Sequence, residues 1–125
     1  MNATWTDEEL GRIGTADDLH IAPYRADGVP GTLTWIWSVV VGDGLYVRAY
    51  HGRESSWYQS AVAYREGIIR TVGIERQVTF EPVDGRIQDA IDAAFLDKYA
   101  GQEYVDEMVL DPPRSATIRI APRED

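Results

Sequence analysis

The sequence predicts a mostly β, α+β fold, namely a six-stranded antiparallel barrel with peripheral helices. Its length of 125 residues is that of one domain, so we expect a single domain over residues 1–125. Segments rich in β-branched and aromatic residues alternate with turn-forming residues, which is typical of strands. An antiparallel sheet of this size has edges that must be hidden, and closure into a barrel hides them.

The first elements are a capped helix and a strand. Thr6 and Glu9 have the spacing of a capping box, and Leu10 and Ile13 follow them, so a short helix is predicted from Thr6 to about Gly14. Residues 19–24 have a strand pattern, and residues 26–31 are dense in turn formers.

The clearest element is a β-hairpin. Residues 32–41 are β-branched and aromatic, Gly42-Asp43-Gly44 is a tight connection, and residues 45–51 form the returning strand. The rest of the chain predicts a short helix, two strands with a bend or bulge at Gly73 between or within them, an amphipathic helix, a weaker helix that stops at Pro112-Pro113, and a last strand. Their ranges are 57–62, 67–74, 76–83, 87–101, 103–110 and 115–121.

Composition excludes several classes of function. The chain has 12 Lys and Arg residues and 21 Asp and Glu residues, and the resulting net charge of -9 disfavours binding to a nucleic-acid backbone. The chain has no Cys and two distant His, so we expect no disulfide, no thiolate chemistry and no metal site. Apolar runs are strand-length and the first ten residues are acidic and polar, so we expect no membrane span, no signal peptide and a cytoplasmic protein.

One loop concentrates groups that suit an anion. The end of a predicted strand leads through Gly52 to the start of a predicted helix, where backbone amides and hydroxyls offer donors and guanidinium groups offer charge. The side chains concerned are Arg48, Tyr50, His51, Arg53, Ser55, Ser56 and Trp57. The alternative is a surface loop in which Arg53 pairs with a carboxylate and Ser55 caps the helix.

Aromatic residues also gather between positions 35 and 64. Trp35 and Trp37 share a strand face with Leu33 and Val39, so core packing is the simplest interpretation for one or both. Aromatic walls also bind flat ring systems, and a small barrel does not need so many rings to fill itself. We predict a core position for Trp35 and a pocket position for Trp37.

The hairpin 34–48, the loop 50–58 and the closing strand give the chain a family resemblance. From about Ala22 to Pro122 it resembles the split β-barrel proteins that bind FMN or deazaflavin, a group that includes pyridoxamine-phosphate-oxidase-like and deazaflavin-dependent nitroreductase-like domains. It is most similar to a small uncharacterised bacterial family within that group. The resemblance implies a six-stranded split barrel that forms a homodimer with the cofactor between subunits.

The resemblance also implies site residues. Trp35, Ile36 and Trp37 are expected near the flavin ring, and Arg48, Tyr50, Arg53, Ser55, Ser56 and Trp57 near the phosphate. Glu54 within the loop and the acidic composition differ from the basic loops usual for deazaflavin and its acidic tail. FMN, or no cofactor at all, is therefore as plausible as deazaflavin.

Three functions follow from these residues. The first is an oxidoreductase that uses FMN or deazaflavin on a small organic molecule, with His51 and Tyr50 as catalytic candidates and Tyr24, Trp37 and His51 near the substrate. The second is a cofactor-free isomerase or cyclase that acts on an apolar metabolite with His51 as acid or base. The third is a protein that binds a small ligand without catalysis.

Overall fold

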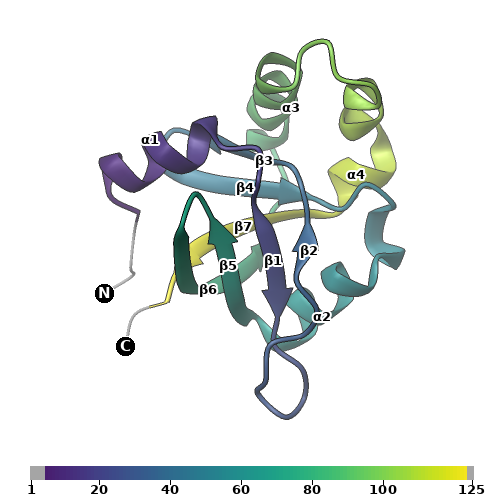
Figure 1. Cartoon of the computed structure of the whole chain (residues 1–125). Coiled ribbons are helices and arrows are strands. Elements are labelled where there is room, and N and C mark those ends of the chain that lie inside the picture. The colour runs from purple at the N-terminus through teal and green to yellow at the C-terminus, as the bar shows by residue number, and fades with distance from the viewer. Residues whose placement is uncertain (1–4, 124–125) are drawn as a thin grey trace.

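The fold is built on one curled antiparallel sheet. The computed structural model describes residues 5–123, and its sheet has seven strands in the order β2-β1-β5-β6-β7-β4-β3 (Figure 1). The α+β class is confirmed, but the predicted six-stranded barrel becomes a curled half-barrel of seven strands. The strands are β1 His20–Pro23, β2 Thr34–Trp35, β3 Ser38–Val41, β4 Gly44–Arg48, β5 Glu66–Thr71, β6 Ile74–Pro82 and β7 Thr117–Pro122.

The extra strand arises because the predicted strand 32–41 is broken at Ile36 and Trp37. β2 pairs with β1 at one edge of the sheet, and β3 pairs with β4 at the other. Strands β5, β6 and β7 lie between those two edges in the sheet order, so one straight strand could not pair with both. The chain therefore leaves one edge and joins the other within two residues.

Helices cover the ends and one side of the sheet (Figure 1). The helices are α1 Asp7–Thr15, α2 Ser56–Tyr64, α3 Ile87–Lys98 and α4 Asp111–Ser115, with 3-10 helices η1 Gly52–Glu54 and η2 Val105–Val109. The capping box is confirmed, since Thr6 and Glu9 satisfy each other's backbone amides. Within residues 5–123 no helix is long and apolar enough to cross a membrane.

The segment after α3 differs from the prediction. A 3-10 helix replaces most of the predicted helix 103–110, and a new helix, α4, begins at Asp111 and includes Pro112 and Pro113. Proline lacks a backbone N–H, and the first turn of a helix does not need one, so the two prolines begin a helix here.

The predicted hairpin turn at Gly42 is present, and a second hairpin turn occurs where a bend or bulge was predicted at Gly73. Val41 pairs with Gly44 across a two-residue turn, and Thr71 pairs with Ile74 across the turn Val72-Gly73. Val72 and Gly73 have positive φ angles of 42° and 77°, the left-handed conformation that a type I′ hairpin turn requires at both positions.

Two hydrophobic clusters hold the molecule together. The larger fills the concave side of the sheet and includes Leu45 and Val47, whereas the smaller lies between the outer face of β3 and β4 and helix α3. All five residues of β4 are therefore buried, because both of its faces are covered. Because of this double coverage, Arg48 at the end of β4 lies beneath α3.

Candidate functional site

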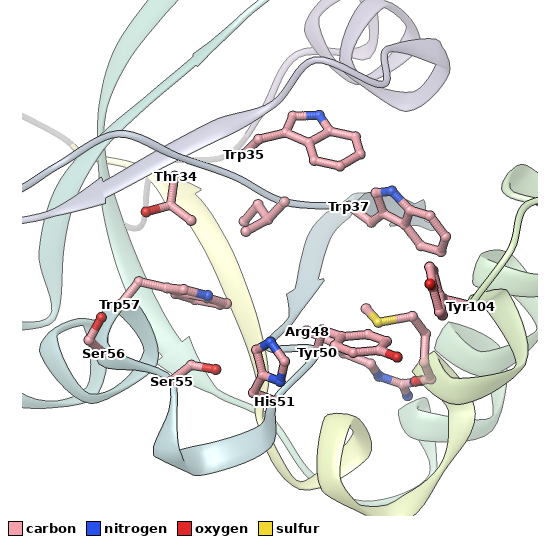
Figure 2. Close-up of a pocket in the computed structure, with 12 residues that line it drawn as sticks. Thr34, Trp35, Trp37, Arg48, Tyr50, His51, Ser55, Ser56, Trp57 and Tyr104 are labelled. Atoms are coloured by element: carbon pink, nitrogen blue, oxygen red, sulfur yellow. The ribbon is translucent and has the colours of Figure 1, made fainter.

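A cavity of about 620 Å³ opens where the two edges of the sheet meet (Figure 2). The break between β2 and β3 forms one wall, the end of β4 and the start of α2 form the opposite wall, and η2 closes one end. The lining residues are Thr34, Trp35, Ile36, Trp37, Arg48, Tyr50, His51, Ser55, Ser56, Trp57, Tyr104 and Met108.

The structure brings together most of the residues predicted for a site. The predicted ring-binding residues 35–37, the catalytic candidates Tyr50 and His51, and the predicted phosphate neighbours 55–57 all line this cavity. Tyr24 does not line it, because it lies at the end of β1, where it forms an isolated bridge to Pro30. Tyr24 is therefore too far along the sheet edge to be one of the cavity's walls.

The prediction of a core position for Trp35 is wrong. Its side chain is 53% exposed, and its indole Nε1 donates a hydrogen bond to the Asp17 carbonyl at 2.6 Å. The larger core is on the other face of this segment, where Ile36 is buried.

Trp37 lies at the edge of the smaller cluster and also lines the cavity. Its ring stacks on that of Tyr99 with a centroid distance of 4.1 Å and an interplanar angle of 5°. Tyr99 is buried, and its hydroxyl accepts a hydrogen bond from the Ser38 amide at 3.0 Å and donates to the Ser38 carbonyl. Tyr99, the residue that follows α3, thus supports the Trp37 ring on the side away from the cavity.

Arg48 reaches the cavity wall, but its donors are already used within the protein. The side chain is fully buried, and burial lowers the pKa of its guanidinium, an effect that the neighbouring Asp92 opposes. Its acceptors lie on α3, η2 and β7, which it joins to β4. They are the Thr117 hydroxyl, the Met108 carbonyl, the Gln88 carbonyl and side-chain oxygen, and Asp92 at 2.6 Å. The geometry therefore favours a structural role for Arg48 over the predicted phosphate contact.

Arg53, also predicted to hold the phosphate, does not line the cavity. It lies in η1, and its Nε donates to the Ser115 carbonyl at 2.9 Å, so the guanidinium points toward α4. Arg48 has no free donor and Arg53 lies outside the cavity lining, so the geometry does not favour the predicted phosphate contact for either arginine.

The start of α2 provides the remaining donors for an anion. Ser55 occupies the N-cap position, but its side chain makes no capping hydrogen bond, contrary to the alternative in which it caps the helix. Gln59 is the first residue of this helix whose amide bonds to a helix carbonyl, that of Ser55 at 3.1 Å, which leaves the earlier amides of the first turn without helix partners. Hydroxyl groups and amides therefore line this end, without a cation.

Tyr50, His51 and Tyr104 form an aromatic group beside the cavity. The ring centroid of Tyr50 lies 5.1 Å from that of His51 and 5.9 Å from that of Tyr104, both edge to face. Desolvation and the nearby carboxylates of Glu107 and Glu103 raise the pKa of Tyr50. Its hydroxyl therefore stays protonated at neutral pH and can donate a proton or a hydrogen bond.

Three lining residues were not predicted. Thr34 precedes the aromatic run, whereas Tyr104 and Met108 come from the segment 103–110, for which only a weaker helix was predicted. Their spacing of four residues, one aromatic and one thioether among carboxylates, is the sequence signal that marks an apolar side of that segment.

The chain belongs to the bacterial family DUF2255, described as uncharacterized proteins conserved in bacteria, whose model matches residues 9–120. No curated protein matches its sequence. An F420 reductase structure is similar with a TM-score of 0.62 and 18% identity, over 91% of this chain and 92% of that one. The conserved hypothetical protein Rv2991 from Mycobacterium tuberculosis is similar with a TM-score of 0.62 and 16% identity, over 98% and 84% of the two chains. At these identities the likeness shows a shared fold.

Proposed function

We propose that this DUF2255 protein binds a flavin-type cofactor, FMN or deazaflavin, and acts as an oxidoreductase on a small organic molecule. The observation that carries the proposal is the aromatic cavity between the β2–β3 break and the start of α2, in a fold similar to that of an F420 reductase. Sites for cofactors of this size are concave, largely apolar and furnished with a few convergent polar groups.

The donor set of the cavity fits such a cofactor. Its volume of about 620 Å³ lies within the usual range for cofactor sites. Trp35, Trp37 and Trp57 offer flat faces to a ring system, as Figure 2 shows. At the other end, Ser55, Ser56 and the first-turn amides of α2 offer neutral donors to a phosphate.

The cofactor, when bound, supplies hydride transfer, and the protein supplies binding, orientation and proton donation. In this proposal the indole rings hold the ring system and exclude water from its faces. His51 and the protonated hydroxyl of Tyr50 lie on one wall, where either can protonate a substrate atom.

The charge of the site favours FMN over a cofactor with a longer acidic tail. The donors of Arg48 are committed within the protein, Arg53 does not line the cavity, and Glu54 lies in the loop before α2. Neutral donors can hold one phosphate, whereas several further negative charges require cations to offset their mutual repulsion.

We also propose that two copies of the chain associate around this site. Trp35, Tyr50 and Tyr104 are among the large apolar side chains that are most exposed, and all three line the cavity. Exposed apolar patches of this kind mark interaction surfaces. Light scattering should give the mass of a dimer at micromolar concentration, and a monomer would contradict the proposal.

A cofactor-free isomerase or cyclase is the second candidate. The committed donors of Arg48 and the position of Arg53 outside the cavity lining favour it, because the cavity then holds an apolar substrate beside His51 with no need for a phosphate anchor. In that case His51 acts as the central acid or base.

Absorbance and intact mass of the purified protein test the proposal first, because a bound flavin or deazaflavin shows both colour and added mass. Titration with FMN and riboflavin then tests the phosphate end. The double variant Ser55→Ala/Ser56→Ala should lose roughly two to four decades of affinity for FMN, since each of the two hydrogen bonds to a charged group contributes about 1.5–3 kcal/mol.

Riboflavin lacks the phosphate, so the same variant should bind it as the wild type does. Ser60→Ala is the matched control, because Ser60 is on α2 but does not line the cavity. Absence of binding to FMN, riboflavin and deazaflavin by the wild type would refute the proposal in favour of the cofactor-free candidate.

A further inference from the structure

The two ends of the cavity differ in chemistry. The α2 end carries hydroxyl groups and helix amides, whereas the η2 end is formed by the rings of Trp37, Tyr50 and Tyr104 and by the Met108 side chain (Figure 2). Tyr50 and Tyr104 meet edge to face and are 40% and 54% exposed, so their ring faces are open to a ligand at the mouth.

The η2 end is also electronegative. Glu103 and Glu107 lie near enough to Tyr50 to raise the pKa of its hydroxyl, together with desolvation, which has the larger effect. Ring faces carry negative electrostatic potential, so the rings and the carboxylates act in the same direction.

The cations around this end are held elsewhere. Arg48 is fully buried, with acceptors for its donors within the protein. Lys98 is beyond the Trp37–Tyr99 stack, where its Nζ donates to the Ser38 carbonyl at 2.6 Å and lies over the Tyr99 ring, and it does not line the cavity. A positively charged ligand would therefore meet rings and carboxylates but no free lysine or arginine of the described cavity lining.

We propose that the η2 end of the cavity binds a small organic cation, a quaternary or protonated ammonium group, between Trp37, Tyr50 and Tyr104. Aromatic cages of Trp and Tyr recognise such cations through cation–π attraction, which grows when the cation is desolvated. Carboxylates at the rim raise the local concentration of cations and oppose anions. An alkylammonium group also has an apolar surface that packs against Met108.

This inference rests on the proposed function in taking the same cavity as the ligand site, and it adds the class of substrate. The cofactor would occupy the α2 end beside Trp35 and Trp57, and the cationic substrate would lie at the η2 end beside Trp37, Tyr50 and His51. Binding of the cation itself needs no cofactor, so the two proposals can be tested separately.

Calorimetric titration with three isosteric probes tests the inference. Choline is a cation, 3,3-dimethylbutan-1-ol is its neutral isostere, and 3,3-dimethylbutanoate is an anion of the same shape. We expect choline to bind roughly 5- to 30-fold more tightly than the alcohol, as one or two cation–π contacts imply, and the anion to bind most weakly. Equal or tighter binding of the alcohol, or no binding of choline at millimolar concentration, would overturn the inference.

Two variants test whether the preference for choline over the alcohol arises at the η2 end of the cavity. Tyr104→Leu removes an exposed ring and Glu107→Gln an exposed charge, so neither should disturb folding. Each should reduce the preference for choline over the alcohol several-fold. The matched controls Tyr64→Leu and Glu81→Gln change an exposed ring and an exposed carboxylate away from this cavity and should leave the preference unchanged.

The results separate this inference from the proposed function. Choline binding without any flavin binding would refute the flavin proposal and support the cation site alone. Flavin binding with no preference for choline would support the cofactor and overturn the cation site. Loss of the preference in the two control variants would place the cation elsewhere on the acidic surface and would also overturn it.

Discussion

Substitution of Asp92 by alanine should destabilise the protein by about 3 kcal/mol. Asp92 lies 2.6 Å from Arg48 and 3.2 Å from Arg114, so its removal leaves two facing guanidinium groups without their shared carboxylate. Breaking a buried ion pair from one side costs about 3–5 kcal/mol. The Asp92 side chain is 23% exposed, and water that reaches the site should hold the cost near the lower end of that range.

Urea unfolding followed by circular dichroism measures this cost, and the thermal midpoint should fall by roughly 10–15 °C. Glu75→Ala is the control, since it removes the exposed Arg70–Glu75 pair, for which a loss of about 0–1 kcal/mol is expected. In an Arg48→Met background, Asp92→Ala should cost much less, because the buried charge is gone. Equal losses for Asp92→Ala and Glu75→Ala would refute the reasoning.

Three further outcomes follow from local geometry. Val72→Asn should stabilise the protein by about 1 kcal/mol in thermal melts, because Val72 holds a positive φ of 42° that asparagine tolerates better. Burial lowers the pKa of Lys98 to about 8 from 10.5, so the unfolded chain binds more protons between these values and stability rises with pH there. Burial raises the pKa of Tyr99 above 10, and this shift opposes the rise in stability above pH 10. Removal of the Lys98 amine in Lys98→Met should therefore flatten the dependence of the melting temperature on pH between pH 8 and 10. Trp37→Ala should cost about 2–3 kcal/mol, less than a fully buried tryptophan, and should also weaken ring binding in a titration.

Local patterns predicted the elements well where neighbouring residues determine them. The capping box at Thr6, the hairpin at Gly42 and the amphipathic helix that ends before Gly101 are all present. The break at Ile36 and Trp37 was not predicted, because it depends on which strands flank the segment in the sheet. The order of the strands in the sheet determines this break, and a local sequence pattern does not show that order.

The sequence predicted where the candidate site lies better than it predicted the roles of the individual side chains. Residues 50–57 and 35–37 were expected together, and the structure places most of them around one cavity. The roles of Arg48 and Arg53 depend on acceptors that are 40 to 69 residues away in sequence, such as Gln88, Ser115 and Thr117. A single sequence does not show that such acceptors consume the donors of an arginine.

The hydroxyl group of Tyr99 binds the backbone immediately after the break in the sheet. At Ser38 the Tyr99 hydroxyl accepts from the backbone amide at 3.0 Å and donates to the backbone carbonyl. Tyr99→Phe keeps the stack on Trp37 but leaves a buried amide unpaired, which should cost about 1–3 kcal/mol. Tyr46→Phe is the control, because Tyr46 is equally well buried but its hydroxyl has no hydrogen bond in the described residues. Because the unpaired amide adjoins the residue that forms the cavity wall, Tyr99→Phe should also weaken ring binding in a titration, whereas Tyr46→Phe should not. If the two variants lose the same stability, the hydroxyl does not hold the break in place.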